Sequence, residues 1–264
     1  MILLVDAGNS RLKWAFLRDG HFESGGSLDR RGTQTAALLR AAWGSLNTPP
    51  ARVVVASVAG PAFRKSLTGW VSRQWRVTPE FPVAQAHGFD VCNAYEDAGR
   101  LGADRWAALV AARASAAVPT CIVDCGTAIV IDALAADGRH LGGLITPGLG
   151  LMRDSLIQRA EEIEEERVSA GNGESSLLAS DTGNAIIGGC LYAAVAMIDR
   201  VVFDLGSELG KGLRTLITGG DAPRIKPLLA TRARYDPDLV LRGVAVMAGH
   251  REATGVSDRE REVS

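Results

Sequence analysis

Residues 2–10 read ILLVDAGNS, an apolar run that ends at an aspartate and continues into a small polar turn. Residues 12–17, LKWAFL, form a second apolar run, and the Asp19-Gly20 pair after it signals a tight hairpin turn. The segment therefore predicts a strand, a polar turn, a second strand and a hairpin turn. Residues 121–134, CIVDCGTAIVIDAL, followed by Asp137-Gly138, predict the same order of elements a second time.

The two segments are related by a constant offset of 118 residues. Seven identical pairs share this offset without a gap: Val5 and Val123, Asp6 and Asp124, Gly8 and Gly126, Ala15 and Ala133, Asp19 and Asp137, Gly20 and Gly138, Gly25 and Gly143. The spacing matches the length of one small domain. The chain is predicted to be duplicated, with one domain over residues 1–117, a second over residues 118–255 and a frayed tail at 256–264.

Other segments complete an α/β pattern. Residues 53–58 predict a buried strand and residues 104–117 a helix. In the second half, helices are expected over residues 149–168 and 184–205, and a strand over 213–218 that ends at Gly219-Gly220. Strands, hairpins and helices in this order predict an α/β fold with helices packed on the faces of the sheets.

Composition bounds the function classes. The chain has 264 residues and a formal net charge of −1, which argues against nucleic acid or an anionic membrane surface as the main partner. No apolar run is expected to cross a bilayer, and the opening residues lack the basic segment that begins a signal peptide, so a cytoplasmic location is expected. The four cysteines lack metal-ligand spacing, and Cys121 and Cys125 are expected to be buried as small apolar residues.

The repeated Asp-x-Gly turns carry the chemistry. A carboxylate at the end of a strand can hold a hydrated cation, and the following glycine lets backbone amides approach an anion. Two such loops facing each other would form a phosphate clamp for phosphoryl transfer. The alternative is a pair of ordinary tight hairpins, which the duplication disfavours. The GxxxxGK[ST] phosphate loop and the strand-GxGxxG-helix fingerprint are both absent from the sequence.

This pattern resembles the superfamily of acetate and sugar kinases, Hsp70 and actin, in which two ribonuclease-H-like domains grip a nucleotide in a cleft. Residues 6–10 correspond to the first phosphate loop of that superfamily and residues 124–128 to the second. Gly219-Gly220 resembles the adenosine-side loop. The resemblance implies two duplicated actin-like ATPase domains with a cleft between them.

A narrower resemblance rests on residues 101–105, LGADR, with Tyr95 upstream. This arrangement resembles the pantothenate-binding motif of type III pantothenate kinases, in the branch also known as Bvg accessory factor. Residues 142–148, GGLITPG, and 182–189, TGNAIIGG, resemble later motifs of the same family. One departure is Ala98, where many relatives have a proline, so a more flexible loop is expected there.

The resemblance implies phosphorylation of pantothenate by ATP to 4′-phosphopantothenate, the first step toward coenzyme A. Asp104 would be the general base, which accepts a proton from the substrate alcohol, although an aspartate at a helix start can equally be an N-cap. Arg105 would bind the substrate carboxylate or form a surface ion pair. Tyr95, Gly102, Ala103 and Thr182 would also contact pantothenate, with Thr182 contributed by the second subunit of a homodimer.

The resemblance also assigns the nucleotide and cation sites. ATP would be bound by Asp6, Ala7, Gly8, Asn9, Ser10, Arg11, Leu12 and Lys13 in the first domain and by Gly126 and Thr127 in the second. Asp6 would serve the Mg²⁺ of the nucleotide, and Asp124 would lie near a monovalent cation, K⁺ or NH₄⁺. The alternatives are another small-molecule kinase or phosphatase on this scaffold, and a non-catalytic nucleotide-binding regulator. The four histidines receive no role.

Overall fold

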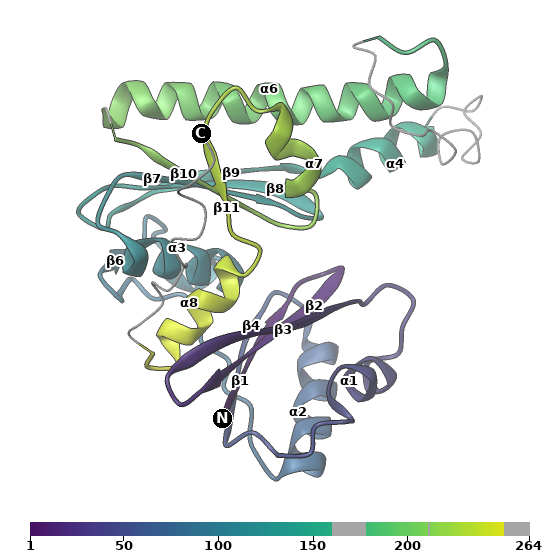
Figure 1. The fold of residues 1–264 in the computed structure, drawn as a ribbon, viewed down its shortest axis with the longest axis vertical. Coiled ribbons are helices and arrows are strands. Elements are labelled where there is room, and N and C mark those ends of the chain that lie inside the picture. Colours follow the sequence, from purple (N-terminus) through teal and green to yellow (C-terminus); the bar gives the residue numbers. More distant parts are fainter. Residues whose placement is uncertain (160–177, 211, 251–264) are drawn as a thin grey trace, which may run out of the picture. The chain divides into compact units, whose positions relative to one another are not determined.

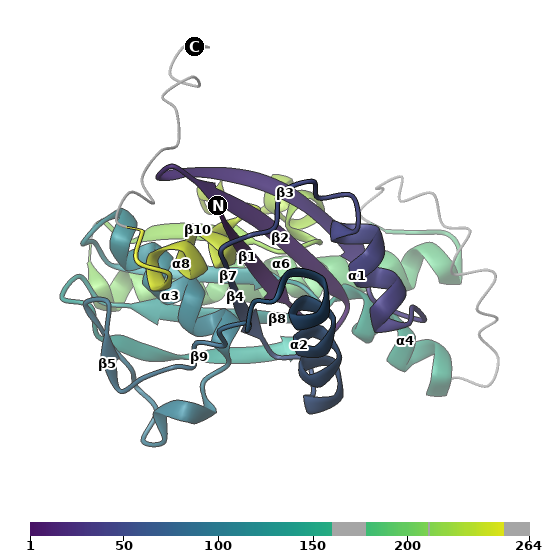
Figure 2. The same ribbon diagram turned by 90° about the horizontal axis from the view of Figure 1, so that it is seen from below.

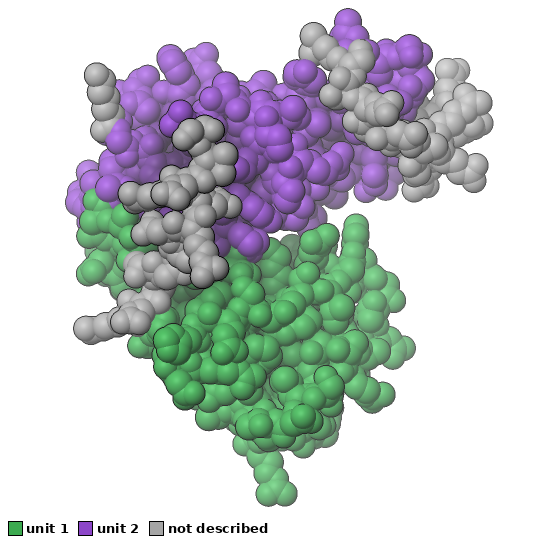
Figure 3. Space-filling view, viewed as in Figure 1, with its two compact units in different colours: residues 1–117, 238–264 green, residues 118–237 purple. Residues whose placement is uncertain are grey.

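The computed structural model describes residues 1–159, 178–210 and 212–250. It divides into two compact units, coloured in Figure 3: Met1–Ala117 together with the segment that begins at Asp238, and Val118–Pro237. The tail predicted at 256–264 lies outside the described residues, as does the end of the helix expected to reach residue 168.

The first unit is built on a four-stranded sheet in the order β3-β2-β1-β4 (Figure 1). β1 (Ile2–Ala7), β2 (Arg11–Arg18) and β3 (His21–Asp29) pair antiparallel, and β4 (Arg52–Ser57) runs parallel to β1. Asp19 and Gly20 form the β2–β3 turn with φ of 49° and 82°. This turn confirms the hairpin signal, because both positions require the left-handed region.

Helices cover both faces of the first sheet. α1 (Thr35–Trp43) and α2 (Pro61–Trp75) lie side by side on one face in Figures 1 and 2. Trp43 fills the core there, with the rings of Trp14, Trp70 and Trp75 centred 6.0 to 6.2 Å away. α3 (Ala103–Ser115) and α8 (Leu239–Met247) pack on the β1–β4 part of the sheet. Short elements precede α3, namely β5 (His87–Gly88), β6 (Val91–Cys92) and η1 (Ala98–Arg100).

The last helix belongs to a different domain than the sequence predicted, because the predicted boundaries assigned residues 238–250 to the second domain. α8 packs closely against α3, where a Cβ added to Gly243 would lie 1.8 Å from the Ala107 carbonyl oxygen. Arg52 of β4 also donates to the Ala248 carbonyl oxygen over 2.9 Å. Residues 238–250 therefore belong with the first unit. Gly243 has no side chain, so the backbones of α8 and α3 can approach closely, and the order of elements in the sequence does not reveal this contact.

The second unit contains a five-stranded sheet in the order β11-β10-β7-β8-β9. β7 (Thr120–Cys125), β8 (Ala128–Leu134) and β9 (His140–Pro147) pair antiparallel. β10 (Arg214–Thr218) runs parallel to β7, and β11 (Ala233–Tyr235) runs parallel to β10. The helices are α4 (Leu149–Arg159), α6 (Thr182–Leu209), the short α7 (Ala222–Ile225) and the 3₁₀ turn η2 (Lys226–Leu228).

The strand order repeats between the two units, as the duplication predicts. In each unit an antiparallel meander of three strands is followed by a strand parallel to the first. The parallel bridge between Val54 and Glu80 is the first unit's counterpart of β11. The duplication found in the sequence is therefore a duplication of topology.

The constant offset does not hold at every position. Asp6 faces Lys13, seven residues on, whereas Asp124 faces Val130, six residues on. The next turn compensates, since Leu17 pairs with Phe22, five residues on, whereas its counterpart Leu134 pairs with His140, six residues on. Ala15 faces Leu4, and Asp132 faces Ile122, the residue 118 positions after Leu4. Ala15 and Asp132 are therefore structurally equivalent, and the sequence identity of Ala15 with Ala133 does not mark equivalent positions.

Helix α6 is long and apolar enough to cross a membrane, with a mean hydropathy of 1.8 over 18 residues, although no such segment was expected from the sequence. The sequence-based expectation overlooked that a stretch with a few charged residues can still have a mean hydropathy high enough for a membrane span. About a quarter of the stretch is buried, 28%, and Ala194, Ile198 and Val202 pack into the core of the second unit. A core helix passes the same test, so this one helix is weak grounds for a membrane span.

Candidate functional site

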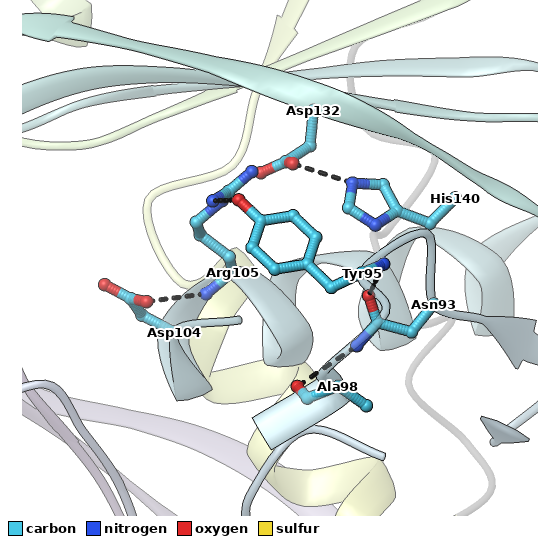
Figure 4. A network of polar contacts seen from close by, with 7 residues as sticks. All are labelled: Asn93, Tyr95, Ala98, Asp104, Arg105, Asp132 and His140. Atoms are coloured by element: carbon cyan, nitrogen blue, oxygen red, sulfur yellow. Dashed lines mark hydrogen bonds and ion pairs between the residues drawn. The ribbon is translucent and has the colours of Figure 1, made fainter. Parts of the chain in front are cut away.

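Tyr95 and Arg105, which the resemblance assigns to pantothenate, contact each other within the first unit. Arg105 Nη1 donates to the Tyr95 hydroxyl over 2.8 Å, and Arg105 Cζ lies 5.5 Å from the centre of the tyrosine ring (Figure 4). Asn93 fixes the tyrosine backbone, because its Oδ1 accepts from the Tyr95 N–H over 3.0 Å. The guanidinium is thereby oriented by an aromatic residue ten positions earlier.

The loop between these residues is tied at Ala98. Asn93 Nδ2 donates to the Ala98 carbonyl oxygen over 3.3 Å, and the Leu101 N–H donates to it over 3.2 Å. Asp97 accepts from the Gly99 N–H and so caps η1. These hydrogen bonds hold the loop where many relatives carry a proline, and its greater flexibility stays a prediction. An open pocket of about 520 Å³ beside it is lined by Tyr95, Glu96, Asp97 and Arg100.

Asp104 lies in the first turn of α3, and the N-cap of that helix is Gly102. The alternative that Asp104 is the N-cap is therefore wrong. Asp104 Oδ1 accepts from the Arg105 N–H over 2.7 Å, and a Cβ on Gly102 would lie 2.6 Å from the same oxygen. Glycine at 102 leaves room for this carboxylate, and the helix dipole stabilises its negative charge.

The loop that the resemblance assigns to phosphate binding joins β1 to β2. The Gly8 N–H donates to the Arg11 carbonyl oxygen over 3.0 Å, which closes the turn. Asp6 and Lys13 are direct cross-strand partners, so their side chains leave the same face of the sheet. A carboxylate and an ammonium group thus flank the loop that the resemblance assigns to ATP.

In the second unit three glycine-containing segments converge on the second phosphate loop. The Gly126 N–H donates to the Ala128 carbonyl oxygen over 3.0 Å, and a Cβ on Gly148 would lie 2.3 Å from the Gly126 carbonyl oxygen. Gly219, with φ of 98°, approaches the Cys125 carbonyl oxygen and the Asp124 carboxylate so closely that a Cβ would lie 2.4 and 2.6 Å from them. The sequence-predicted phosphate loop and adenosine-side loop are therefore adjacent in space.

The cysteines of the second sheet are buried in its core. Cys121 and Cys125 are free and buried, as expected. Burial raises the pKa of the Cys125 thiol to about 12, with smaller contributions from the nearby Asp124 and Asp221 carboxylates. Among the described residues no group of three or more histidine, cysteine, aspartate or glutamate side chains is placed to hold a metal ion.

Thr182 opens α6 and belongs to the second unit. Asp181 caps this helix, because its Oδ1 accepts from the Asn184 N–H over 2.9 Å. Thr182 is exposed at this helix start, in a different unit from Tyr95 and Arg105.

Sequence reasoning missed a buried pair in the second unit, His140 and Asp132. Their side chains meet at 2.9 Å between Nε2 and Oδ1, and are 0% and 5% exposed (Figure 4). The sequence signal was weak, because the two residues lie on adjacent strands and form no short motif.

Comparison with known proteins defines the family. The family model for type III pantothenate kinase matches residues 2–204. The chain is 48% identical to a type III pantothenate kinase of Nitrosococcus oceani, with 94% of each chain covered, and 39% identical to one of Laribacter hongkongensis, with 94% and 98% covered.

Two solved structures have folds similar to that of this chain. A Baf family protein from Campylobacter jejuni superposes with a TM-score of 0.59 at 20% identity, covering 94% of this chain and 98% of that one. The ethanolamine utilization protein EutJ from Carboxydothermus hydrogenoformans gives 0.52 at 13% identity, with 92% and 88% covered. The fold is that of the actin-like ATPases, and by sequence the chain belongs to the type III pantothenate kinase family.

Proposed function

We propose that this protein transfers the γ-phosphoryl group of ATP to pantothenate and forms 4′-phosphopantothenate, the first step of coenzyme A synthesis, in the cytoplasm. The observation that carries the proposal is the pairing of Tyr95 with Arg105 beside Asp104 at the start of α3, in a chain of this family. This arrangement offers a cation for a substrate carboxylate and a carboxylate for a substrate hydroxyl.

Asp104 is the proposed general base. In a loose phosphoryl-transfer transition state the attacking alcohol needs only a modest base, and a carboxylate suffices. The hydrogen bond from the Arg105 N–H occupies Oδ1 and orients the group. Arg105, held by Tyr95, would bind the pantothenate carboxylate, and Gly102, Ala103 and Thr182 would complete the substrate contacts.

The proposed ATP site uses residues 6–13 of the first unit with Gly126 and Thr127 of the second. Backbone amides around Gly8 and the Lys13 ammonium would bind phosphate oxygens. Asp6 would hold the nucleotide's Mg²⁺, and Asp124 a K⁺ or NH₄⁺ ion. Both carboxylates are hard oxygen ligands, which suit these cations. Within the part of the chain that the structure describes, no cluster of three or more histidine, cysteine, aspartate or glutamate side chains offers a transition-metal site. When bound, Mg²⁺ would supply charge neutralisation at the transferring phosphoryl group.

A homodimer is proposed from the exposed side of α6. Tyr192 and Phe203 on this helix are 49% and 71% exposed, while Ile198 of the same helix is fully buried. An apolar surface of this kind on a helix that begins at Thr182 fits a second copy of the chain. A monomeric mass in solution, with full activity kept on dilution, would contradict the dimer.

The reaction is tested by ADP release from purified protein with ATP and pantothenate. Release that depends on pantothenate is expected, with mass spectrometry detecting the phosphorylated product. A chain that binds ATP but turns over no pantothenate under any cation would instead support the non-catalytic regulator.

A further inference from the structure

The first phosphate loop is bound by an arginine outside the motifs. Arg30 directly follows β3, and its Nη1 donates a hydrogen bond to the Gly8 carbonyl oxygen. Its backbone N–H donates to the Ser10 carbonyl oxygen over 2.8 Å. One residue therefore binds two carbonyl oxygens of the loop that connects β1 to β2.

The Arg30 guanidinium is itself held in place. Its Cζ lies 4.0 Å from the ring centre of Phe63, a buried residue of α2. Burial lowers the pKa of this guanidinium, which nevertheless remains protonated at neutral pH. Because one face stacks on an aromatic ring and one edge bonds a carbonyl, the group has a defined position relative to the loop.

Holding the Gly8 carbonyl fixes the direction of the next N–H group. The peptide bonds described are all trans, and in a trans peptide the carbonyl and the N–H point in opposite directions. With the Gly8 oxygen turned toward Arg30, the Asn9 N–H is directed to the other side of the peptide. A flipped peptide would instead present an oxygen to a phosphate, which repels it.

We infer that Arg30 is a positioning residue for the nucleotide triphosphate, which acts by holding the Gly8–Asn9 peptide with its N–H group turned toward the phosphates. The inference rests on the proposed ATP site at residues 6–13. It predicts an effect on nucleotide affinity and leaves the binding of pantothenate unchanged.

The test measures MgATP affinity of the full chain by calorimetry, without pantothenate. Arg30→Met keeps much of the side-chain length but removes the donors, so binding is expected to weaken about tenfold. The KM for ATP should rise by the same factor, and the KM for pantothenate should stay constant. The matched control is Arg31→Met, because Arg31 is 74% exposed and pairs with Asp29 at 2.6 Å. Its affinity for MgATP is expected to equal that of the wild type.

Arg30→Lys provides a second variant that keeps the charge but loses the planar fork, and an intermediate loss is expected. Wild-type affinity in Arg30→Met, or an equal loss in Arg31→Met, would overturn the inference. If Arg30→Met does not fold, Arg30→Lys decides, and wild-type affinity there overturns it. A wild-type chain that binds MgATP but leaves pantothenate unmodified would overturn the proposed function alone, whereas one that binds no MgATP would overturn both.

Discussion

The two loops proposed to bind phosphate share a topology but are built differently. The first loop is one residue longer, pairs Asp6 with Lys13 across the strands and is bound by the Arg30 guanidinium. The second pairs Asp124 with Val130, and its neighbours are Gly148 and Gly219, whose backbones approach it closely. Duplication preserved the scaffold while the first loop came to rely on charged side chains and the second on backbone shape. Removing charge should therefore have its largest effects in the first unit, and adding bulk in the second.

The largest effect is expected from a charge removed in the first unit. Asp104→Asn keeps the size of the side chain and an oxygen for the Arg105 N–H, but it abolishes basicity. Pantothenate turnover should fall by roughly two to four orders of magnitude. Calorimetry should show unchanged MgATP binding, and the melting temperature should stay close to that of the wild type. Turnover near the wild-type value would remove Asp104 from the role of base.

The next effect is steric and belongs to the second unit. Gly219→Ala must place a Cβ against the Cys125 carbonyl at a φ of 98°, and Gly148→Ala one against the Gly126 carbonyl. Each should destabilise the fold by about 2 to 3 kcal/mol in denaturant unfolding. The matched control is Gly150→Ala in α4, where a Cβ would meet nothing within 4 Å. Equal stability of Gly219→Ala and Gly150→Ala would show that the close approach is not required.

A smaller effect is expected at the cross-strand partner of Asp6. Lys13→Met retains the aliphatic stem but removes a charge from the proposed phosphate site, so the KM for ATP should rise about tenfold or less. The rise should shrink at high salt, because ions screen the lost interaction. Lys65→Met, at an exposed position of α2, is the control. Identical ATP kinetics for the two variants would exclude Lys13 from the site.

The smallest effect concerns the cation proposed at Asp124. Replacing K⁺ by Na⁺ at constant ionic strength should lower turnover, because the smaller ion fits a different coordination shell. Asp124→Asn should lose most of this discrimination between the two ions. Equal turnover of the wild type in sodium and potassium buffers would speak against a monovalent-cation site.

Short-range patterns predicted much of this molecule. The apolar runs and the Asp-Gly turn specified β1, β2, β7 and β8, and residues 184–205 correctly indicated the long α6. These features depend on neighbours in sequence, so local periodicity is enough to find them. The motif around Tyr95 and Arg105 was recognisable for the same reason, since the two residues are only ten positions apart.

Long-range contacts were not predictable. The return of α8 to the first unit depends on the fit of Gly243 against Ala107, more than a hundred residues earlier. Arg30 follows a strand like many other arginines, and only the fold brings its guanidinium to Gly8. The one-residue shift that makes Ala15 equivalent to Asp132 was hidden in the sequence. In the second unit the first loop is one residue shorter and the next turn is longer, so the offset of 118 residues is restored after the turn.

The most direct measurement is the rate of ADP release by the purified wild-type chain, with MgATP and potassium, in the presence and absence of pantothenate. Pantothenate should raise the rate at least about a hundredfold over the background of ATP hydrolysis, with one phosphopantothenate formed per ADP. Omission of Mg²⁺ should abolish the release. An ADP release rate that pantothenate does not change, in a chain that is folded and binds ATP, would contradict the proposed function.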